Sequence, residues 1–308
     1  MTKKTIRIAT RQSVLAQVQA RAVGDALVKK NPDYAYELHF VTTTGDKFMG
    51  DLAKVGGKVA FVKEVEEAIM NGEADIAAHS MKDVPTDMPE GMIIGAMLPR
   101  ADIRDAVVCR PGEDFASLKP GAVVGTSSVR RAAQIRYAFP HLEVKPVRGN
   151  VQTRLEKLKA REYDALILAK AGLDRLDLQS RITVVFEPDM MCPSVSQGAI
   201  GVECAKDNAE MVELLKSINH EETSHCVQTE RAYLDHLGGS CYTPIAGFVE
   251  ITKGGNLRLI GLVASEDGKK ILRTRHKMAF KDWQKLAKAA ADDLFEQGAK
   301  DIIAATYK

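Results

Sequence analysis

The sequence predicts an α/β protein with two α/β units of similar size and a smaller C-terminal α+β domain. Short apolar runs alternate with amphipathic helical patterns, this rhythm restarts after Leu98-Pro99-Arg100, and it changes again from about residue 220. The 308 residues suffice for two or three ordinary domains. Hydrophobic residues make up 45% and charged residues 27% of the chain, which excludes a disordered or collagen-like protein.

The first unit is expected to hold a largely parallel sheet covered by helices, because strand and helix patterns alternate along it. The expected strands are residues 6–9, 37–41 and 76–78, and the expected helices are residues 13–28 and 61–70.

The second unit shows the same rhythm, with helices expected after Ser127 and after Asn150. Its expected strands lie near residues 106–109, 122–124, 143–147 and 165–169. A further strand at 199–203 and an amphipathic helix at 209–218 could return to either unit, and we assign them to the first.

The C-terminal pattern begins with a helix to about residue 237 and a glycine-rich loop. Antiparallel strands are expected at residues 246–251, 257–264 and 270–276, followed by a helix at 281–297. We therefore predict three domains: residues 1–98 with a return segment at about 197–217, residues 103–193, and residues 220–308.

The charges nearly balance, with 43 lysines and arginines against 41 aspartates and glutamates. This argues against a general polyanion binder but is compatible with a local basic cleft. Nucleic-acid binding is disfavoured because aromatic residues make up only 6% of the chain and are not interleaved with the arginines.

The N-terminal residues contain no apolar stretch long enough for a signal peptide or a membrane span, so we expect a cytoplasmic protein without a membrane partner.

A candidate anion site lies in the segment GTSSVRR, residues 125–131, which follows a predicted strand and opens a predicted helix. Hydroxyl groups, first-turn N–H groups and the side chains of Arg130 and Arg131 would together favour negative charge there. Ordinary capping by Ser127, with both arginines on a solvated face, explains the same pattern. The segment is neither a Walker loop nor a dinucleotide fingerprint.

Further arginines stand where loops meet the ends of predicted strands: Arg11, Arg148, Arg154 and Arg175. In open α/β sheets the carboxyl ends of the strands border the usual ligand crevice, so these side chains are candidates to converge. Guanidinium binds carboxylates and phosphates bidentately, which suits a ligand that carries several such groups. Each arginine taken alone is more often a surface charge.

The segment HSMKDVP, residues 79–85, follows the third predicted strand. Lys82 and Asp83 could form a simple surface ion pair. Facing an arginine-rich cleft, Asp83 would instead supply a carboxylate that holds N–H donors, stabilises a cation and exchanges protons with a leaving amine.

The five cysteines are odd in number and never spaced as Cys-x-x-Cys, so neither a disulfide framework nor a metal site is predicted. Cys241 lies in the turn-like loop GGSCYTP, residues 238–244, where reactivity depends on its surroundings. Cys109, Cys204 and Cys226 fall on apolar strand or helix patterns and are expected to be small buried hydrophobes.

Together these segments resemble the porphobilinogen deaminase (hydroxymethylbilane synthase) family along nearly the whole chain. The matching segments are IATRQS (8–13), GGK (56–58), HSMKDVP, GTSSVRR, RGNVQTR (148–154) and the Cys241 loop. The resemblance implies two domains with the fold of bilobed periplasmic binding proteins and a third domain with a cofactor cysteine. It also implies a monomeric transferase of tetrapyrrole (haem-type) biosynthesis, which joins four porphobilinogen molecules and passes 1-hydroxymethylbilane to the next enzyme.

The resemblance further implies a dipyrromethane cofactor attached to Cys241 through a thioether, with Asp83 as the catalytic carboxylate. The expected cofactor-binding residues are Lys82, Asp83, Ser128, Arg130 and Arg131, the expected substrate-binding residues are Arg11, Ser13, Arg148, Arg154 and Arg175, and Lys54 and Lys58 are expected in a mobile loop over the cleft. The sequence departs from the family at Val59-Ala60, Ser196 and Ser240. The alternative is a non-catalytic bilobed protein that captures a small polyanion, because a fold alone does not fix a function.

Overall fold

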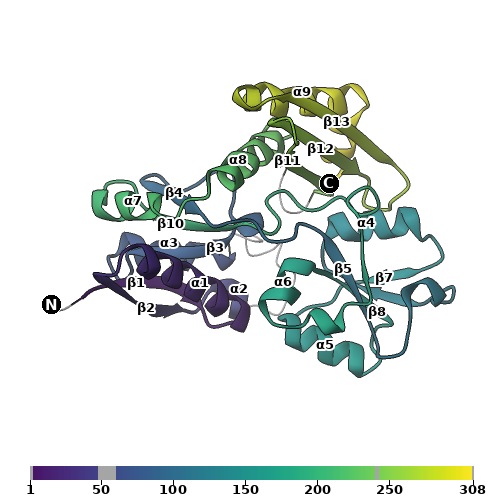
Figure 1. The fold of residues 1–308 in the computed structure, drawn as a ribbon. Helices are drawn as coiled ribbons and strands as arrows, with labels where there is room; N and C mark the ends of the chain where they lie inside the picture. The colour runs from purple at the N-terminus through teal and green to yellow at the C-terminus, as the bar shows by residue number, and fades with distance from the viewer. Residues whose placement is uncertain (1–2, 48–59, 240–242, 307–308) are drawn as a thin grey trace. The chain divides into compact units, whose positions relative to one another are not determined.

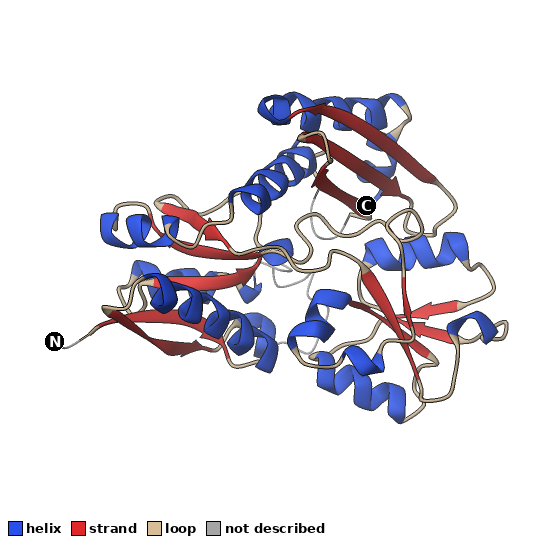
Figure 2. Cartoon of the chain, viewed as in Figure 1, coloured by secondary structure: helices blue, strands red, loops and turns tan. Residues whose placement is uncertain are grey.

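The computed structural model describes residues 3–47, 60–239 and 243–306, and within these ranges it contains three separate β-sheets (Figures 1 and 2). The chain forms two compact units. The first comprises Met1–Ala101 with Gly198–His225, and the second comprises Asp102–Gln197 with Cys226–Lys308.

The first unit contains a five-stranded sheet in the order β2-β1-β3-β10-β4. Its strands are β1 (Lys4–Arg11), β2 (Tyr34–Val41), β3 (Ile76–Ser80), β4 (Met92–Met97) and β10 (Ile200–Ala205). β1 is parallel to β2 and β3, whereas β10 runs antiparallel between β3 and β4. The sheet is largely parallel, as predicted, and a strand from late in the chain lies inside it.

Helices cover both faces of this sheet, because successive residues of a strand point to opposite faces. Ile76 and Val202 pack on the face covered by α1 (Val14–Lys30) and α7 (Ala209–Lys216). Ala77 packs on the opposite face, which α3 covers. α2 (Thr44–Lys47) and α3 (Lys63–Met70) follow β2 in the chain.

The α/β part of the second unit also contains a five-stranded sheet. Its sheet has the order β7-β6-β8-β5-β9, in which β6 is parallel to β7 and β8, and β5 is antiparallel to β8 and β9. The strands are β5 (Asp105–Cys109), β6 (Val123–Gly125), β7 (Glu143–Lys145), β8 (Ala165–Ala169) and β9 (Val184–Val185). α4 (Val129–Ala138) covers one face, and α5 (Val151–Lys159) and α6 (Lys170–Arg175) cover the other.

The C-terminal part of the second unit is a three-stranded antiparallel sheet in the order β11-β12-β13. Its elements are β11 (Ile245–Ile251), β12 (Asn256–Ala264), β13 (Ile271–Ala279), α8 (Glu221–His236), α9 (Trp283–Glu296) and α10 (Ala299–Thr306). One face packs against these three helices around the fully buried Tyr233. The other face packs against α4 through Phe248, Leu262 and Ala133.

The predicted fold class, two α/β domains and a smaller C-terminal α+β domain, is confirmed. The sequence analysis missed β4, β9, α2, α6 and α10. Three of these are short: β9 has two residues, α2 has four, and α6 has six with Gly172 among them. It also missed the short 3-10 helices η3 (Met81–Asp83), η4 (Phe115–Ser117), η5 (Gln179–Arg181) and η6 (Phe280–Asp282). The division into three domains near residues 98, 103 and 220 stays a prediction.

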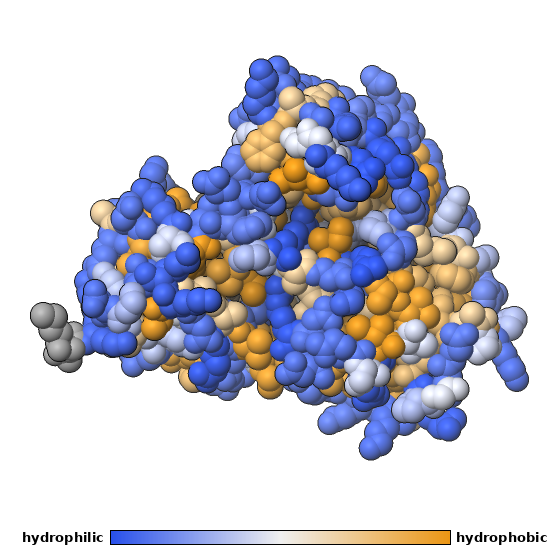
Figure 3. Space-filling view, in the orientation of Figure 1, coloured by the Kyte–Doolittle hydropathy of each residue, from blue (hydrophilic) through white to orange (hydrophobic). Residues whose placement is uncertain are grey.

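No helix in the described part of the chain is long and apolar enough to cross a membrane. The face drawn in Figure 3 mixes hydrophilic residues with apolar patches.

Ser196 has a left-handed backbone, with φ of 62°, in the segment that leads into β10. It is 1% exposed, and its N–H donates to Glu230 Oε2 at 2.6 Å. Its buried Oγ has no hydrogen-bond partner among the described residues. A side chain in this conformation costs about 1–2 kcal/mol per residue, and burial of an unpaired hydroxyl adds to that cost.

We predict that Ser196→Gly raises the free energy of unfolding by about 1 kcal/mol, because glycine adopts this conformation without strain and removes the unpaired hydroxyl. Ser194→Gly is the matched control: its φ is not positive, so the same change should lower stability by about 0.5–1 kcal/mol. Urea denaturation of the three proteins measures both effects. A lower free energy of unfolding in Ser196→Gly would contradict the inferred backbone strain at Ser196.

Candidate functional site

Both α/β sheets place candidate residues at the carboxyl ends of their parallel strands. Arg11 closes β1, and η3, which contains Lys82 and Asp83, follows β3 directly. In the second unit Ser128 follows β6, Arg148 follows β7, and α6, which ends at Arg175, follows β8. Because parallel strands end at a common sheet edge, each set lies where α/β proteins bind ligands.

A pocket at this edge of the first sheet brings Arg11 and Asp83 together. Its polar and aromatic lining residues are Thr10, Arg11, Gln19, Phe61, His79, Ser80 and Asp83. Gln19 Nε2 donates to Ser80 Oγ at 2.7 Å, whereas the buried Thr10 Oγ1 has no partner among the described residues. A guanidinium and a carboxylate therefore lie together in the wall of this pocket.

Arg11 is held by two neighbours that the sequence analysis did not identify. Its guanidinium carbon lies 4.2 Å from the centre of the Phe61 ring, and its Nε lies 3.2 and 3.1 Å from the two carboxylate oxygens of Asp46. Burial raises the pKa of Asp46, but hydrogen bonds from Arg11 and Thr43 outweigh it and leave that pKa below its usual range. The only signal in the sequence was the position of Asp46 shortly after a predicted strand.

Ser13, also expected to bind substrate, is the N-cap of α1 and accepts a hydrogen bond from the N–H of Ala16 at 3.4 Å. Its substrate role stays a prediction.

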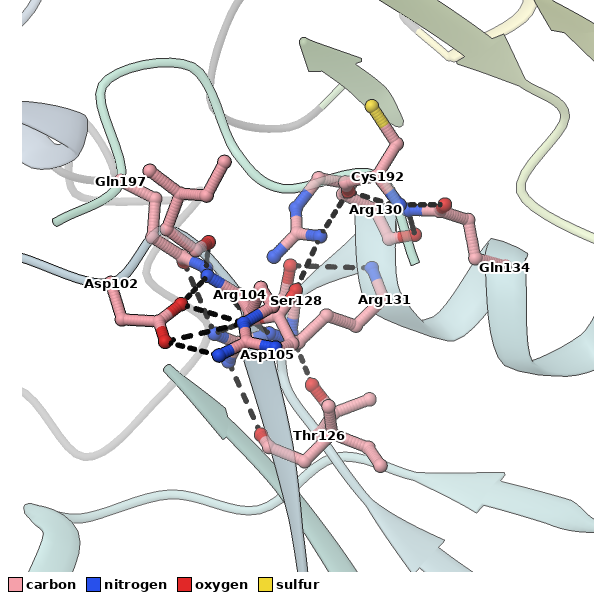
Figure 4. A network of polar contacts seen from close by, with 12 residues as sticks. Asp102, Arg104, Asp105, Thr126, Ser128, Arg130, Arg131, Gln134, Cys192 and Gln197 are labelled. Atoms are coloured by element: carbon pink, nitrogen blue, oxygen red, sulfur yellow. Dashed lines mark hydrogen bonds and ion pairs between the residues drawn. The ribbon is translucent and has the colours of Figure 1, made fainter. Parts of the chain in front are cut away.

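Arg130 and Arg131 are buried, with 4% and 7% of their surface exposed, and both bind Asp105, which is fully buried (Figure 4). Arg130 Nη1 donates to Asp105 Oδ2 at 2.8 Å, and Arg131 Nη2 and Nε donate to Oδ1 at 2.7 and 3.0 Å. Gln197 Nε2 also donates to Oδ1, at 2.9 Å. The alternative that placed both arginines on a solvated face is therefore wrong, because Asp105 compensates their burial.

Capping by Ser127 is wrong as well. Ser128 is the N-cap of α4 and accepts from the N–H of Arg131 at 3.4 Å, whereas the Ser127 hydroxyl donates to the Val147 carbonyl at 2.7 Å. Ser127 is therefore turned toward the loop after β7.

The arginine pair is suited to hold a further anion. Two guanidinium groups and one carboxylate leave these three side chains with a formal surplus of one positive charge. Arg130 uses Nη1 for both of its hydrogen bonds, to Asp105 and to the Cys192 carbonyl, and its Nε and Nη2 make none to the described residues. A ligand carboxylate could balance the surplus charge and accept hydrogen bonds from Nε and Nη2 of Arg130, because guanidinium binds such groups strongly.

The other arginines of the second unit lie at the same sheet edge. Arg148 is half-buried and precedes Asn150, the N-cap of α5. Arg154 Nε donates to the Gly149 carbonyl at 2.8 Å, which ties this side chain to the loop before its own helix. Arg175 closes α6, and burial lowers the pKa of its guanidinium, against the opposing effect of Asp174.

Cys241, Lys54, Lys58, Val59 and Ser240 lie outside the described residues. The other four cysteines, Cys109, Cys192, Cys204 and Cys226, are buried, as expected for three of them. Burial raises the pKa of Cys192 to about 12 and that of Cys204 to about 11. In the described ranges no group of three or more His, Cys, Asp or Glu side chains is arranged to hold a metal ion.

We predict that Asp105→Asn lowers the free energy of unfolding by about 3–5 kcal/mol at pH 7, because it leaves two buried guanidinium groups without their carboxylate. Asp189→Asn is the matched control: this exposed carboxylate pairs with Arg275 at 2.7 Å, so its loss should cost at most about 1 kcal/mol. Urea denaturation measures both variants. Equal losses in the free energy of unfolding would show that the buried cluster contributes no more to stability than an exposed ion pair.

The contribution of Asp105 to the free energy of unfolding depends on pH in a defined direction. Burial raises the pKa of Asp105, but Arg130 and Arg131 outweigh it and hold that pKa well below its usual range. Its stabilisation is therefore complete above the unfolded pKa of about 4 and is lost as pH falls toward the folded value. The deficit of Asp105→Asn should accordingly be constant from pH 6 to pH 8.

Two family models match the chain. "Porphobilinogen deaminase, dipyromethane cofactor binding domain" matches residues 6–213, and "Porphobilinogen deaminase, C-terminal domain" matches residues 224–296. Among solved structures, the methionine-binding protein MetQ has a TM-score of 0.46 and 11% identity, covering 74% of this chain and 94% of that chain.

Relatives named porphobilinogen deaminase are similar over nearly the full length. The Bacillus pumilus protein is 42% identical over 302 residues, covering 97% of this chain and 96% of its own. The Nitrosomonas europaea protein is 44% identical over 303 residues, covering 98% of each chain. This chain belongs to the porphobilinogen deaminase family.

Proposed function

We propose that this chain is a transferase that deaminates four porphobilinogen molecules, joins them head to tail on a covalently bound dipyrromethane primer and releases 1-hydroxymethylbilane. The observation that carries this proposal is the pocket in which Arg11 and Asp83 lie together at the strand ends of the first sheet. The product would pass to the next enzyme of tetrapyrrole biosynthesis.

The chemistry of the side chains fits these ligands. Each porphobilinogen ring carries an acetate, a propionate and a pyrrole N–H, so a growing chain needs several cations and one carboxylate. The surplus positive charge of the Arg130–Arg131–Asp105 cluster and the hydrogen-bonding capacity of Arg130 suit a carboxylate of the cofactor. Lys82 and Ser128 complete the proposed cofactor set, and Ser13, Arg148, Arg154 and Arg175 complete the proposed substrate set with Arg11.

The cofactor is proposed to be linked through a thioether to Cys241. When bound, the dipyrromethane supplies a pyrrole carbon that acts as the primer for chain growth. Burial of the thiols of Cys109, Cys192, Cys204 and Cys226 supports this choice, because a buried protonated thiol is a poor nucleophile. Lys54 and Lys58 are proposed to lie in a loop that covers the bound chain.

Asp83 is the proposed catalytic carboxylate. From η3 it faces the same pocket as Arg11, so it can accept pyrrole N–H groups and compensate the positive charge that develops when the amine leaves.

The non-catalytic binding protein is not favoured, because both family models, including that of the C-terminal domain, belong to the deaminase. A cytoplasmic location and a monomeric state are part of the proposal.

We predict that Cys241→Ala abolishes cofactor attachment and activity, since a methyl group cannot form a thioether. Intact-mass measurement of the purified wild type should show the extra mass of two deaminated porphobilinogen units, and the variant should lack it. Cys226→Ala, which removes a buried thiol, is the control and should keep the extra mass. The same mass on the Cys241→Ala protein would place the cofactor elsewhere.

We predict that Asp83→Asn keeps the cofactor mass but lowers kcat by about 100-fold or more, because an amide accepts a hydrogen bond but cannot compensate a cation. Asp87→Asn changes an exposed carboxylate four residues away and should leave kcat within about two-fold. Steady-state turnover of porphobilinogen measures both, and near-normal turnover in Asp83→Asn would move the catalytic role to another residue.

A further inference from the structure

A histidine and a glutamate form a buried pair behind the pocket that contains Asp83. His79 Nε2 lies 2.7 Å from Glu203 Oε2, and the two residues are 7% and 0% exposed. In the antiparallel register of β3 and β10, His79 faces Gly201 and Ala77 faces Glu203. All four positions therefore lie on the sheet face that α3 covers.

His79 also lines the pocket itself, together with Asp83 and Ser80. Since Nε2 is bound to Glu203, Nδ1 is the ring nitrogen that remains for a ligand in the pocket. A carboxylate partner fixes the tautomer of a histidine and stabilises the charge that the ring gains on protonation. The pair thus has the arrangement of a histidine base with an orienting acid.

A second buried acid lies on the same face of the sheet as the pair. Glu66 reaches this face from α3 and is 6% exposed. Burial, and then the charge of Glu203, raise the pKa of Glu66 to about 7, so near neutral pH it holds a proton much of the time. Among the described residues, the other ionisable groups that share the pocket with His79 are Arg11 and Asp83.

Resting on the proposed function, we propose that His79 is the proton acceptor of this pocket and that Glu203 is its positioning residue. In each condensation the C–N bond of the protonated aminomethyl group breaks, and the nitrogen leaves with the electron pair as ammonia. After the new C–C bond forms, His79 Nδ1 takes the proton from the newly bonded pyrrole carbon, and the C–H electrons return to the ring. His79 then passes this proton to the ammonia, which departs as ammonium, while Asp83 stays a carboxylate.

The kinetic test uses holoenzyme in which intact mass has verified the cofactor. His79→Gln should lower kcat by about 100-fold or more, because general base catalysis typically contributes that much. Glu203→Gln should lower kcat while KM stays within about two-fold, because an amide no longer holds the imidazole ring in one tautomer. His276→Gln, which breaks the comparable 3.1 Å contact with Asp293 in the C-terminal sheet, is the matched control and should change neither quantity.

A second readout does not depend on turnover. Nitrogen-15 NMR of histidine-labelled holoenzyme without substrate should show His79 with its proton on Nε2, and Glu203→Gln should give a mixture of the two tautomers, because an amide can either accept from the ring or donate to it. An unchanged tautomer in Glu203→Gln, or near-normal kcat in His79→Gln, would overturn the proposal. If His79→Gln does not fold, the Glu203→Gln measurements decide. Failure of the proposed function is distinguishable, because the wild type would then not consume porphobilinogen while the NMR result would stand.

Discussion

The buried carboxylate of Asp105 is the interaction on which the second unit depends. It stands at the start of β5 and binds two arginines from the first turn of α4, and Gln197 from the segment before β10 donates to the same group. α4 also packs against the C-terminal sheet through Ala133, and Gln134 exchanges hydrogen bonds with the backbone of Cys192. One acidic residue thus connects β5, α4 and the segment before β10 through hydrogen bonds. α4 in turn packs against the C-terminal sheet.

The same cluster shows why these two cations can be buried. Two buried guanidinium groups are acceptable only when a carboxylate compensates them, because an isolated buried charge is costly. Asp105 compensates one of these two charges. Both side chains are held in place, since neither arginine can turn away without losing its buried partner.

In the first unit, chain segments far apart in sequence position the proposed catalytic turn. The N–H of Met81, the first residue of η3, donates to the Ala199 carbonyl at 3.1 Å. A Cβ at Gly201 would lie 2.1 Å from the Met81 sulfur, so the Met81 side chain packs directly against this glycine of β10. The turn that contains Asp83 and the strand that contains Glu203 are therefore held against each other.

The sequence by itself determined the order of strands and helices and the placement of charged residues at strand ends, because both follow from local apolar periodicity and chain direction. It could not show that β10 lies between β3 and β4, nor that Arg130 and Arg131 are buried, since both depend on partners about 25 to 120 residues away. Asp105 and Glu203 carried no local signal for the same reason: each looks like an ordinary acid until the fold brings it to the arginine pair or to His79. Only the tertiary structure decided which charges are compensated, because electrostatic pairing depends on distance in space and not on separation along the chain.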